Sequence, residues 1–375
     1  MLPVRQMFVK PSVRFYRAPD KGTVENPVYD QAARLSPYRE QWYGGSLAFR
    51  MKRIPPAAAE GGMFMKMIME LLFLAIGFGM LVKGADWFVE GSSAIADRFG
   101  VPQLVIGLTI VAMGTSAPEA AVSITAALKG NAEITIGNIV GSNILNILII
   151  LGITSTIVTL AVAKSTVRIE IPYMILITLI LFLAGLSGSV VSRGEGVLLW
   201  ILFLIYLGYL LYMAMSGRGD KLDAQENLPL WKMLFFAVAG LFLVVAGSDV
   251  TVDAATAIAE LMGMSERFIG LTIVALGTSL PELFTSVSAA LKGKADIAIG
   301  NIVGSNIFNI LFVVGTTALI TPVSFQPEFR IDTLAAIGAA LLLLAGTFRK
   351  QKLTRKTGIV MLLCYAGYFI WLINS

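Results

Sequence analysis

The sequence contains one long stretch twice. Residues 107–153 and 270–316 align without a gap at a constant offset of 163, and 32 of the 47 paired positions are identical. Each copy places a Gly-Thr-Ser tripeptide, a proline and a glutamate inside an apolar segment long enough to cross a bilayer. A polar motif that is repeated within apolar surroundings predicts a membrane fold with internal symmetry, and it marks where function should be sought.

Composition agrees with a membrane protein. Of the 375 residues, 56% are hydrophobic and 14% are charged, and the mean hydropathy is +0.78. Apolar runs of about 20 residues predict an all-α polytopic bundle, because a barrel would show alternating strands. The chain has no histidine and one cysteine, which excludes a histidine proton relay, a histidine-ligated metal and an intrachain disulfide. We expect the lipid bilayer, and not nucleic acid, to be its surrounding partner.

Ten apolar segments follow a basic N-terminal extension at residues 1–62. This extension lacks a run that could bury a face, so we expect it to be disordered. A mis-assigned start or a fused sequence accounts for it as well as a genuine domain does, and a structured regulatory extension is the less favoured alternative. A polar linker at 216–230 separates a first repeat at 63–215 from a second at 231–375. The predicted spans are 67–96, 102–128, 133–161, 169–187, 195–215, 231–261, 267–291, 296–320, 330–348 and 356–374.

Five spans in each half require the second copy of the repeat to enter the membrane with the opposite orientation. The distribution of Lys and Arg tests the two possible placements, because these residues are enriched in cytoplasmic loops. With both termini outside, the inner loops hold thirteen Lys and Arg residues and the outer loops hold four. We therefore predict ten transmembrane helices in two inverted five-helix repeats, with the central linker in the cytoplasm. Inverted repeats are typical of transporters that bind substrate near the bilayer midplane.

A proline interrupts the same helix in each copy of the repeat. Pro118 and Pro281 each remove an amide donor and disturb the carbonyl about one turn earlier. We expect the backbone carbonyls near Ala112 and Ala275 to be released from helical hydrogen bonds and to face a ligand. A kink without a ligand is the alternative, but it does not explain why the same kink recurs beside the same glutamate.

Two glutamates lie in the interiors of the second and seventh spans. Glu119 and Glu282 are costly in a membrane, and two symmetric carboxylates would repel each other unless a cation lay between them. Hard oxygen donors surround both positions. Such donors suit Ca²⁺, which takes six to eight oxygens, and equally Na⁺, whereas Zn²⁺ and Cu²⁺ prefer softer ligands. The candidate side chains are Thr115, Ser116, Ser142 and Asn146 in the first copy and Thr278, Ser279, Ser305 and Asn309 in the second.

Further acidic residues lie along the first and sixth spans. Asp86 and Glu90 have the repeat equivalents Asp249 and Asp253. We interpret them as cavity-lining or interfacial groups, with Lys83 as a candidate partner. A role in cation entry is the alternative.

The Gly-Thr-Ser-x-Pro-Glu and Gly-Ser-Asn-Ile-x-Asn motifs resemble those of the sodium/calcium exchanger group of the cation/calcium exchanger superfamily, in its short prokaryotic form. The resemblance covers residues 67–375. It implies ten spans in two inverted repeats and four cation sites between spans two, three, seven and eight. By position it implies the ligands named above, with the carbonyls of Ala112 and Ala275. Some archaeal and potassium-dependent relatives carry aspartate where this chain has Asn309, which lowers the expected site charge to −2 and argues against potassium dependence.

The predicted function is antiport of Na⁺ and Ca²⁺ across the cell membrane by alternating access at one site, with no catalytic residues, no cofactor and no obligatory protein partner. A proton-coupled Ca²⁺ antiporter would use the same glutamates and stays open as an alternative. A cation channel is less favoured because the sequence has no TVGYG-type filter loop. An intramembrane hydrolase is weaker still, because no histidine or nearby lysine could activate Ser116.

Overall fold

The computed structural model of this chain describes residues 60–129, 132, 134–216, 229–263 and 275–374. Disorder is predicted for residues 1–62, of which 1–59 lie outside the described residues, as does most of the predicted linker. The first described helix begins at Glu60, and the domain boundary between residues 62 and 63 stays a prediction. The described part is helical apart from four two-residue strands, which agrees with the predicted all-α class.

The first half follows the order of the predicted spans. A 40-residue helix, α2 (Glu60–Phe99), leads into a broken span that bends by 50° between Thr115 and Ala117. The chain then crosses through two helical segments containing π-helical turns and ends in a regular helix. The remaining elements of this half are α3 (Gln103–Ile106), η1 (Gly107–Val111), α4 (Ala112–Thr115), α5 (Ala117–Leu128), α6 (Ile134–Leu145), η2 (Asn146–Leu151), α7 (Gly152–Ile157), β1 (Leu160–Ala161), η3 (Thr166–Glu170), α8 (Ile171–Gly188), β2 (Val190–Val191) and α9 (Arg193–Ser216).

The second half repeats these elements at the offset of the sequence repeat. Helices α5 and α13 correspond residue by residue, and the π-helices η2 and η5 begin at the equivalent residues Asn146 and Asn309. Strand β3 is likewise the equivalent of β1. The elements are α10 (Leu230–Leu261), α12 (Ala275–Gly277), α13 (Leu280–Leu291), α14 (Ala295–Phe308), η5 (Asn309–Val314), α15 (Gly315–Ile320), β3 (Val323–Ser324), α16 (Glu328–Phe348), β4 (Lys352–Leu353) and α17 (Arg355–Asn374).

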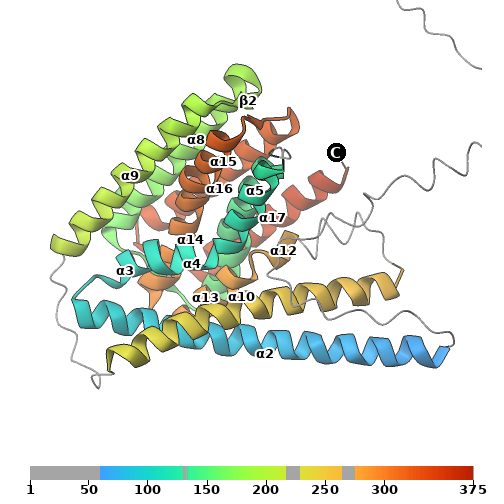
Figure 1. Cartoon of the computed structure of the whole chain (residues 1–375). Coiled ribbons are helices and arrows are strands. Elements are labelled where there is room, and N and C mark those ends of the chain that lie inside the picture. The colour runs from blue at the N-terminus through green and yellow to red at the C-terminus, as the bar shows by residue number, and fades with distance from the viewer. Residues whose placement is uncertain (1–59, 130–131, 133, 217–228, 264–274, 375) are drawn as a thin grey trace, which may run out of the picture. The chain divides into compact units, whose positions relative to one another are not determined.

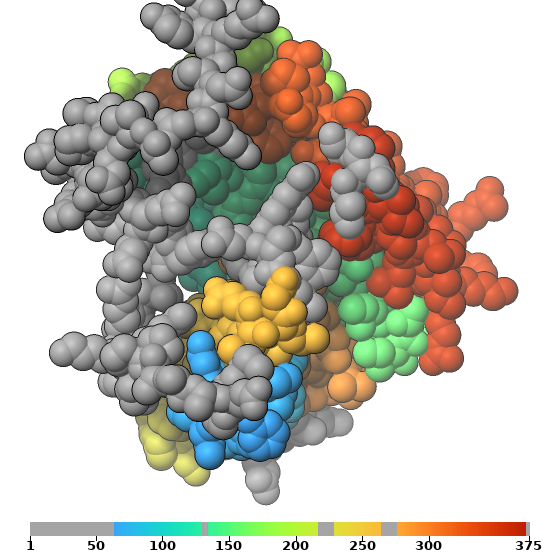
Figure 2. All heavy atoms as spheres, turned by 90° about the vertical axis from the view of Figure 1, so that its right-hand side faces the viewer, coloured from blue at the N-terminus to red at the C-terminus, as the bar shows by residue number. Residues whose placement is uncertain are grey.

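The two longest helices, α2 and α10, pack antiparallel along most of their length (Figure 1). Figure 2 shows the blue end of α2 beside the yellow α10. Glycines allow their backbones to approach closely: a Cβ on Gly84 would lie 2.7 Å from the Val244 amide nitrogen, and one on Gly247 would lie 2.8 Å from the Met80 Cβ. Small residues at the contact between two helices commonly allow close helix packing in membranes. The two helix backbones are therefore in close contact where these glycines lie.

Two short strand pairs join the halves. β1 pairs antiparallel with β4, with Leu160 opposite Leu353, and β2 pairs antiparallel with β3, with Val191 opposite Val323. Helix packing across the halves is equally reciprocal, because α7 packs on α17 as α15 packs on α9. The strand pairs and helix contacts therefore connect the two halves on both sides of the helices that carry the polar motifs.

The helical segments α6–η2 and α14–η5 form the centre of the frame. Every residue from Ile297 to Phe308 is buried, and so are Asn309 to Leu311. Gly304 allows α14 to pack closely against the residues around Leu108, because a Cβ on Gly304 would lie 2.8 Å from the Leu108 Cα. In contrast, α2 and α9 expose many large apolar side chains, as helices in contact with lipid do.

Seven helices of the described part are long and apolar enough to cross a membrane, and the bent pair Gln103–Thr115 with Ala117–Leu128 makes an eighth. The chain is therefore a multi-pass membrane protein. The count of ten spans stays a prediction, since the segment preceding α12 lies outside the described residues and α17 is not among the seven.

Candidate cation-binding site

The two glutamates of the repeat lie at equivalent helix starts. Glu119 is in the first turn of α5 and Glu282 in the first turn of α13, and each directly follows a proline that is the second residue of its helix. Both side chains are 0% exposed. They lie within electrostatic reach of each other, and no salt bridge to a Lys or Arg of the described residues compensates either charge. A helix N-terminus offers only partial compensation, so the pair favours a bound cation.

Serines from both halves hold the carboxylates in place. The Ser116 hydroxyl donates to Glu282 Oε1 over 2.8 Å, and the Ser142 hydroxyl donates to Glu119 Oε1 over 3.5 Å. Ser142 and Ser279 also share a hydrogen bond of 3.3 Å between their hydroxyls. The bond from Ser116 to Glu282 joins the two halves, so the repeated motifs meet at one site, as the sequence predicts.

Four buried oxygens of this site have no hydrogen-bond partner among the described residues. They are Oε2 of Glu119 and Glu282 and Oδ1 of Asn146 and Asn309, which form two repeat-related pairs. A buried acceptor without a partner costs about 1–3 kcal/mol, and a charged one costs more. Two carboxylate and two amide oxygens are the hard donors that Ca²⁺ and Na⁺ accept. Asn146 and Asn309 also open the π-helices η2 and η5, a feature common at functional sites.

The broken helix behaves differently from the sequence prediction. The carbonyl of Ala112 is not released, because it accepts the backbone N–H of Ser116 at 3.0 Å and the hydroxyl of Ser305 at 3.3 Å. Pro118 instead lacks the backbone N–H that would donate a helical hydrogen bond to the Gly114 carbonyl. In the second copy the Ser279 amide donates to Leu276 over 3.2 Å, so the two breaks are not identical. Whether the carbonyls of Ala112 and Ala275 bind a cation stays a prediction.

The two threonines occupy different surroundings. Thr115 is fully buried and donates to the Asn301 side-chain oxygen over 3.0 Å, whereas Thr278 is half-buried. Because the chain breaks after Thr115, Thr115 and Glu119 do not lie on one continuous helix. The predicted side chains are buried or half-buried, either beside the two breaks or on α6, η2, α14 and η5: Thr115, Ser116, Glu119, Ser142, Asn146, Thr278, Ser279, Glu282, Ser305 and Asn309.

Four asparagines complete the site and were not singled out from the sequence. Asn138 and Asn301 each donate to the backbone carbonyl of the neighbouring glutamate and to a serine of the same helix. Asn143 and Asn306 bond to each other's backbone across the halves. Their identity in both copies, within Gly-Asn-Ile-Val-Gly-Ser-Asn, is the sequence feature that could have revealed them.

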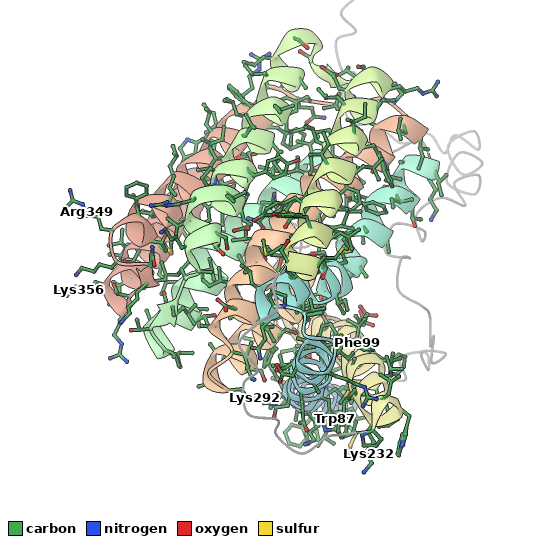
Figure 3. All side chains as sticks on the ribbon, turned by 90° about the vertical axis from the view of Figure 1, so that its left-hand side faces the viewer. Trp87, Phe99, Lys232, Lys292, Arg349 and Lys356 are labelled. Atoms are coloured by element: carbon green, nitrogen blue, oxygen red, sulfur yellow. The ribbon has the colours of Figure 1, made fainter. Side chains whose placement is uncertain are left out.

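Asp86 of the first span has a different partner from the one predicted. Asp86 forms a salt bridge of 3.4 Å with Lys292, whose ammonium also donates to the Asp86 carbonyl over 2.7 Å. Lys83 lies over the Trp87 ring instead. Figure 3 shows Lys292 on the same side of the molecule as Trp87, the neighbour of Asp86 in sequence.

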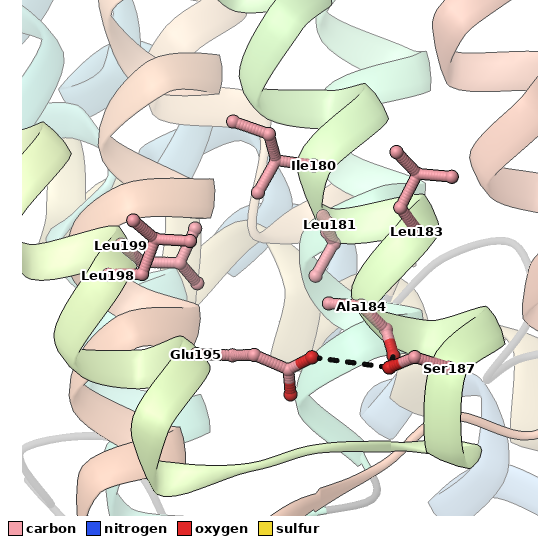
Figure 4. Close-up of a pocket in the computed structure, with 8 residues that line it drawn as sticks. All are labelled: Ile180, Leu181, Leu183, Ala184, Ser187, Glu195, Leu198 and Leu199. Atoms are coloured by element: carbon pink, nitrogen blue, oxygen red, sulfur yellow. Dashed lines mark hydrogen bonds between the residues drawn. The ribbon is translucent and has the colours of Figure 1, made fainter.

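An apolar pocket between α8 and α9 lies apart from this site. Its polar residues are Ser187 and Glu195, joined by a hydrogen bond of 3.4 Å (Figure 4). None of its lining residues is a predicted ligand: Ile180, Leu181, Leu183, Ala184, Ser187, Glu195, Leu198 and Leu199. Most of them are leucines and isoleucines, so lipid chains suit it better than ions do.

A multi-pass helical bundle with two buried, repeat-related carboxylates and unpartnered oxygens defines a membrane transporter of cations. The family model described as sodium/calcium exchanger protein matches residues 69–212 and 232–374. The chain belongs to this family of exchangers, whose members are transporters and not enzymes.

Relatives of similar length support this assignment. Sodium/calcium exchanger MaX1 of Methanosarcina acetivorans is 32% identical over 80% of this chain and 97% of its own length. Inner membrane protein YrbG of Escherichia coli is 34% identical over 82% of this chain and 96% of its own length. The solved structure of the sodium-calcium exchanger NCX_Mj, soaked with zero Na⁺ and Ca²⁺, superposes with a TM-score of 0.72 at 32% identity, covering 82% of this chain and 99% of that one.

Proposed function

We propose that this chain is a secondary antiporter that moves Na⁺ down its gradient and extrudes Ca²⁺ through one shared site. The observation that carries the proposal is the set of four unpartnered oxygens on Glu119, Glu282, Asn146 and Asn309. Two carboxylates match the charge of one Ca²⁺, and the neutral oxygens around them suit Na⁺ equally. The names of the relatives MaX1 and NCX_Mj support the same ions. The ions are cargo, and we propose no resident cofactor and no obligatory protein partner.

Coupling in this scheme arises from competition. Ca²⁺ and Na⁺ need the same two carboxylates, so occupancy by one displaces the other. One Ca²⁺ neutralises Glu119 and Glu282, whereas an excess of Na⁺ leaves net positive charge. Transport is then electrogenic, and each charge that crosses contributes about 2.3 kcal/mol per 100 mV.

We further propose that the two halves, at 63–215 and 231–375, are inverted repeats with both termini outside and the linker at 216–230 in the cytoplasm. The strand pairs support this placement. β1 and β4 lie in two loops that the charge distribution places inside, and β2 and β3 lie in two loops that it places outside. Each pair therefore joins loops of the same side. Figure 3 shows Arg349 and Lys356, from the most basic of the inner loops, projecting away from the helices.

Alternating access is supported by an asymmetry between the halves. Helix α2 packs against α13, where Asp86 accepts the Ser288 hydroxyl over 2.6 Å and meets Lys292. We call Asp86, Ser288 and Lys292 the inner latch, because Lys292 lies in a loop proposed to be cytoplasmic.

The equivalent residues of the other half are Asp249, Thr125 and Lys129, which we call the outer latch. No hydrogen bond or salt bridge joins them within the described residues, and α10 and α5 make at most marginal contact. The structure thus fits a state that is closed to the cytoplasm and open to the outside.

The proposal is tested by reconstituting the full chain in vesicles and following uptake of radioactive Ca²⁺. An outward-directed Na⁺ gradient at equal pH on both sides should drive Ca²⁺ accumulation, and collapse of the Na⁺ gradient should abolish it. Accumulation driven by a pH gradient alone would identify the proton-coupled alternative. Conductance without a counter-ion would identify a channel.

A further inference from the structure

Four asparagine side chains meet where the centres of the two halves touch. The Asn143 amide nitrogen donates to the Asn306 backbone carbonyl over 3.2 Å, and the Asn306 amide nitrogen donates to the Asn143 backbone carbonyl over the same distance. All these groups are buried, with Asn143 at 4% and Asn306 at 1% exposure. The two residues form a reciprocal pair between α6 and α14.

The side-chain oxygens of this pair accept hydrogen bonds from two predicted cation ligands. Asn309 Nδ2 donates to Asn143 Oδ1 over 3.1 Å, and Asn146 Nδ2 donates to Asn306 Oδ1 over 2.9 Å. The first bond joins the halves, and so does the second. Each member of the pair therefore holds the ligand amide of the opposite half.

The hydrogen-bond chemistry leaves one orientation for every amide in this cluster. A backbone carbonyl can only accept, so the nitrogen of Asn143 must face Asn306 and its oxygen must face Asn309. That oxygen can only accept in turn, so Asn309 must present its nitrogen to Asn143. The Asn309 oxygen is then directed away, and it is one of the unpartnered oxygens of the site. The same reasoning applies to Asn146, whose amide nitrogen must face the Asn306 side-chain oxygen. The hydrogen bonds thus decide which amide atom is oxygen and which is nitrogen in all four side chains.

We propose that Asn143 and Asn306 are positioning residues for cation binding, each of which turns the side-chain oxygen of Asn309 or Asn146 toward the ion. The proposal rests on the proposed function, because it takes those two asparagines as ligands. A freely rotating amide would present its N–H groups to the cation in part of its population, and these repel positive charge. A fixed acceptor is organised before the ion arrives, so binding does not have to order it.

The test measures the Ca²⁺ concentration that gives half-maximal thermal stabilisation of the purified full chain, since a ligand that binds the folded state raises its melting temperature. Asn143→Leu keeps the approximate shape and removes the bond to Asn309. We expect half-saturation to need about tenfold more Ca²⁺, the value of one buried hydrogen bond. Asn143→Ser is the second variant, in case the leucine prevents folding. Thr154→Val is the control, because it removes a buried bond of 2.6 Å to the Ile150 carbonyl within one helix and leaves the site intact.

Double variants distinguish a positioning role from a structural one. If Asn143 acts through Asn309, N143L adds no further loss of Ca²⁺ affinity in an N309L background, but adds its full loss in an N146L background. Asn306 should show the reverse pattern. Equal coupling of N143L to both ligand positions, or a loss no larger than that of T154V, overturns the proposal. A normal Ca²⁺ response in both N309L and N146L would instead remove the ligand assignment itself, which separates the two failures.

Discussion

The inner latch gives the sharpest prediction, because the chain contains its own matched comparison. Asp86→Asn keeps the size of the side chain and removes its charge, which weakens the bonds from Ser288 and Lys292. Asp249→Asn makes the same change at the equivalent position, where no such bonds are present in the described structure. We expect D86N to favour the state open to the cytoplasm and D249N to favour the state open to the outside.

The contacts of Asp86 determine how far Asp86→Asn shifts the equilibrium between the two states. Lys292 and Asp86 have side chains that are 34% and 41% exposed, so solvent screens the pair and its loss costs about 0.2–1 kcal/mol. The 2.6 Å bond from Ser288 changes from charge-assisted to neutral, which costs about 1 kcal/mol more. The sum of about 1–2 kcal/mol shifts the equilibrium between the two states by about fivefold to thirtyfold.

The assay is the apparent Ca²⁺ affinity measured separately from each side of sealed vesicles of known orientation. Apparent dissociation constants scale inversely with the fraction of molecules open to that side. A shift away from a dominant outward state therefore changes external affinity little. The same shift improves cytoplasmic affinity by nearly its full factor, about fivefold or more for D86N.

Two results would refute this reasoning. If D86N leaves cytoplasmic affinity unchanged, the contacts of Asp86 do not bias the equilibrium. If D249N changes both affinities in the same direction as D86N, the effect reflects loss of negative charge near the ion path, and the two latches are not alternatives.

Other predictions follow from the site and its packing. Glu119→Gln and Glu282→Gln should each lower Ca²⁺ transport at least about a hundredfold while the protein still folds, because a buried amide costs less than a buried charge; transport at the normal rate in either variant contradicts the site. Glu170→Gln, which replaces a fully buried glutamate outside the site, should transport normally in the same flux assay. Gly304→Ala should lower the free energy of unfolding by about 1–3 kcal/mol, whereas Gly367→Ala, which has no described atom within 4 Å, should not, as thermal melting will show. Membrane potential at fixed ion gradients should change the Ca²⁺ flux, and a voltage-independent flux would exclude net charge movement.

Much of the helical frame could be predicted from the sequence. The described helices agree with the predicted spans to within a few residues at most ends, because apolar run length and Gly-Pro punctuation are local properties. The two glutamates could be singled out for a similar reason, because Glu119 and Glu282 recur within apolar surroundings, each with the same Gly-Thr-Ser tripeptide and proline before it. The repeat added the observation that the same polar motif occurs twice, which a single copy could not have given.

The remainder depends on contacts between distant residues. Asp86 and Lys292 are far apart in sequence, so periodicity offered only the nearer Lys83 as a partner. The Ala112 carbonyl also accepts the hydroxyl of Ser305 from the other half, a contact that local sequence does not reveal. Within Gly-Ser-Asn-Ile-x-Asn, the sequence cannot tell which asparagine keeps an oxygen free, because that follows from the pairing of Asn143 with Asn306.

The close glycine contacts between α2 and α10 bear on how these two helices move. Because the backbones of the two helices meet closely at Gly84 and Gly247 along a long antiparallel contact, we expect a displacement to carry both helices together as a single lever. Asp86 lies on one arm of this lever and Asp249 on the other. A movement that separates Asp86 from Lys292 then also displaces Asp249 relative to Lys129, so the two entrances are linked by rigid geometry. Leakage through a state with both entrances open would require breaking the helix pair itself.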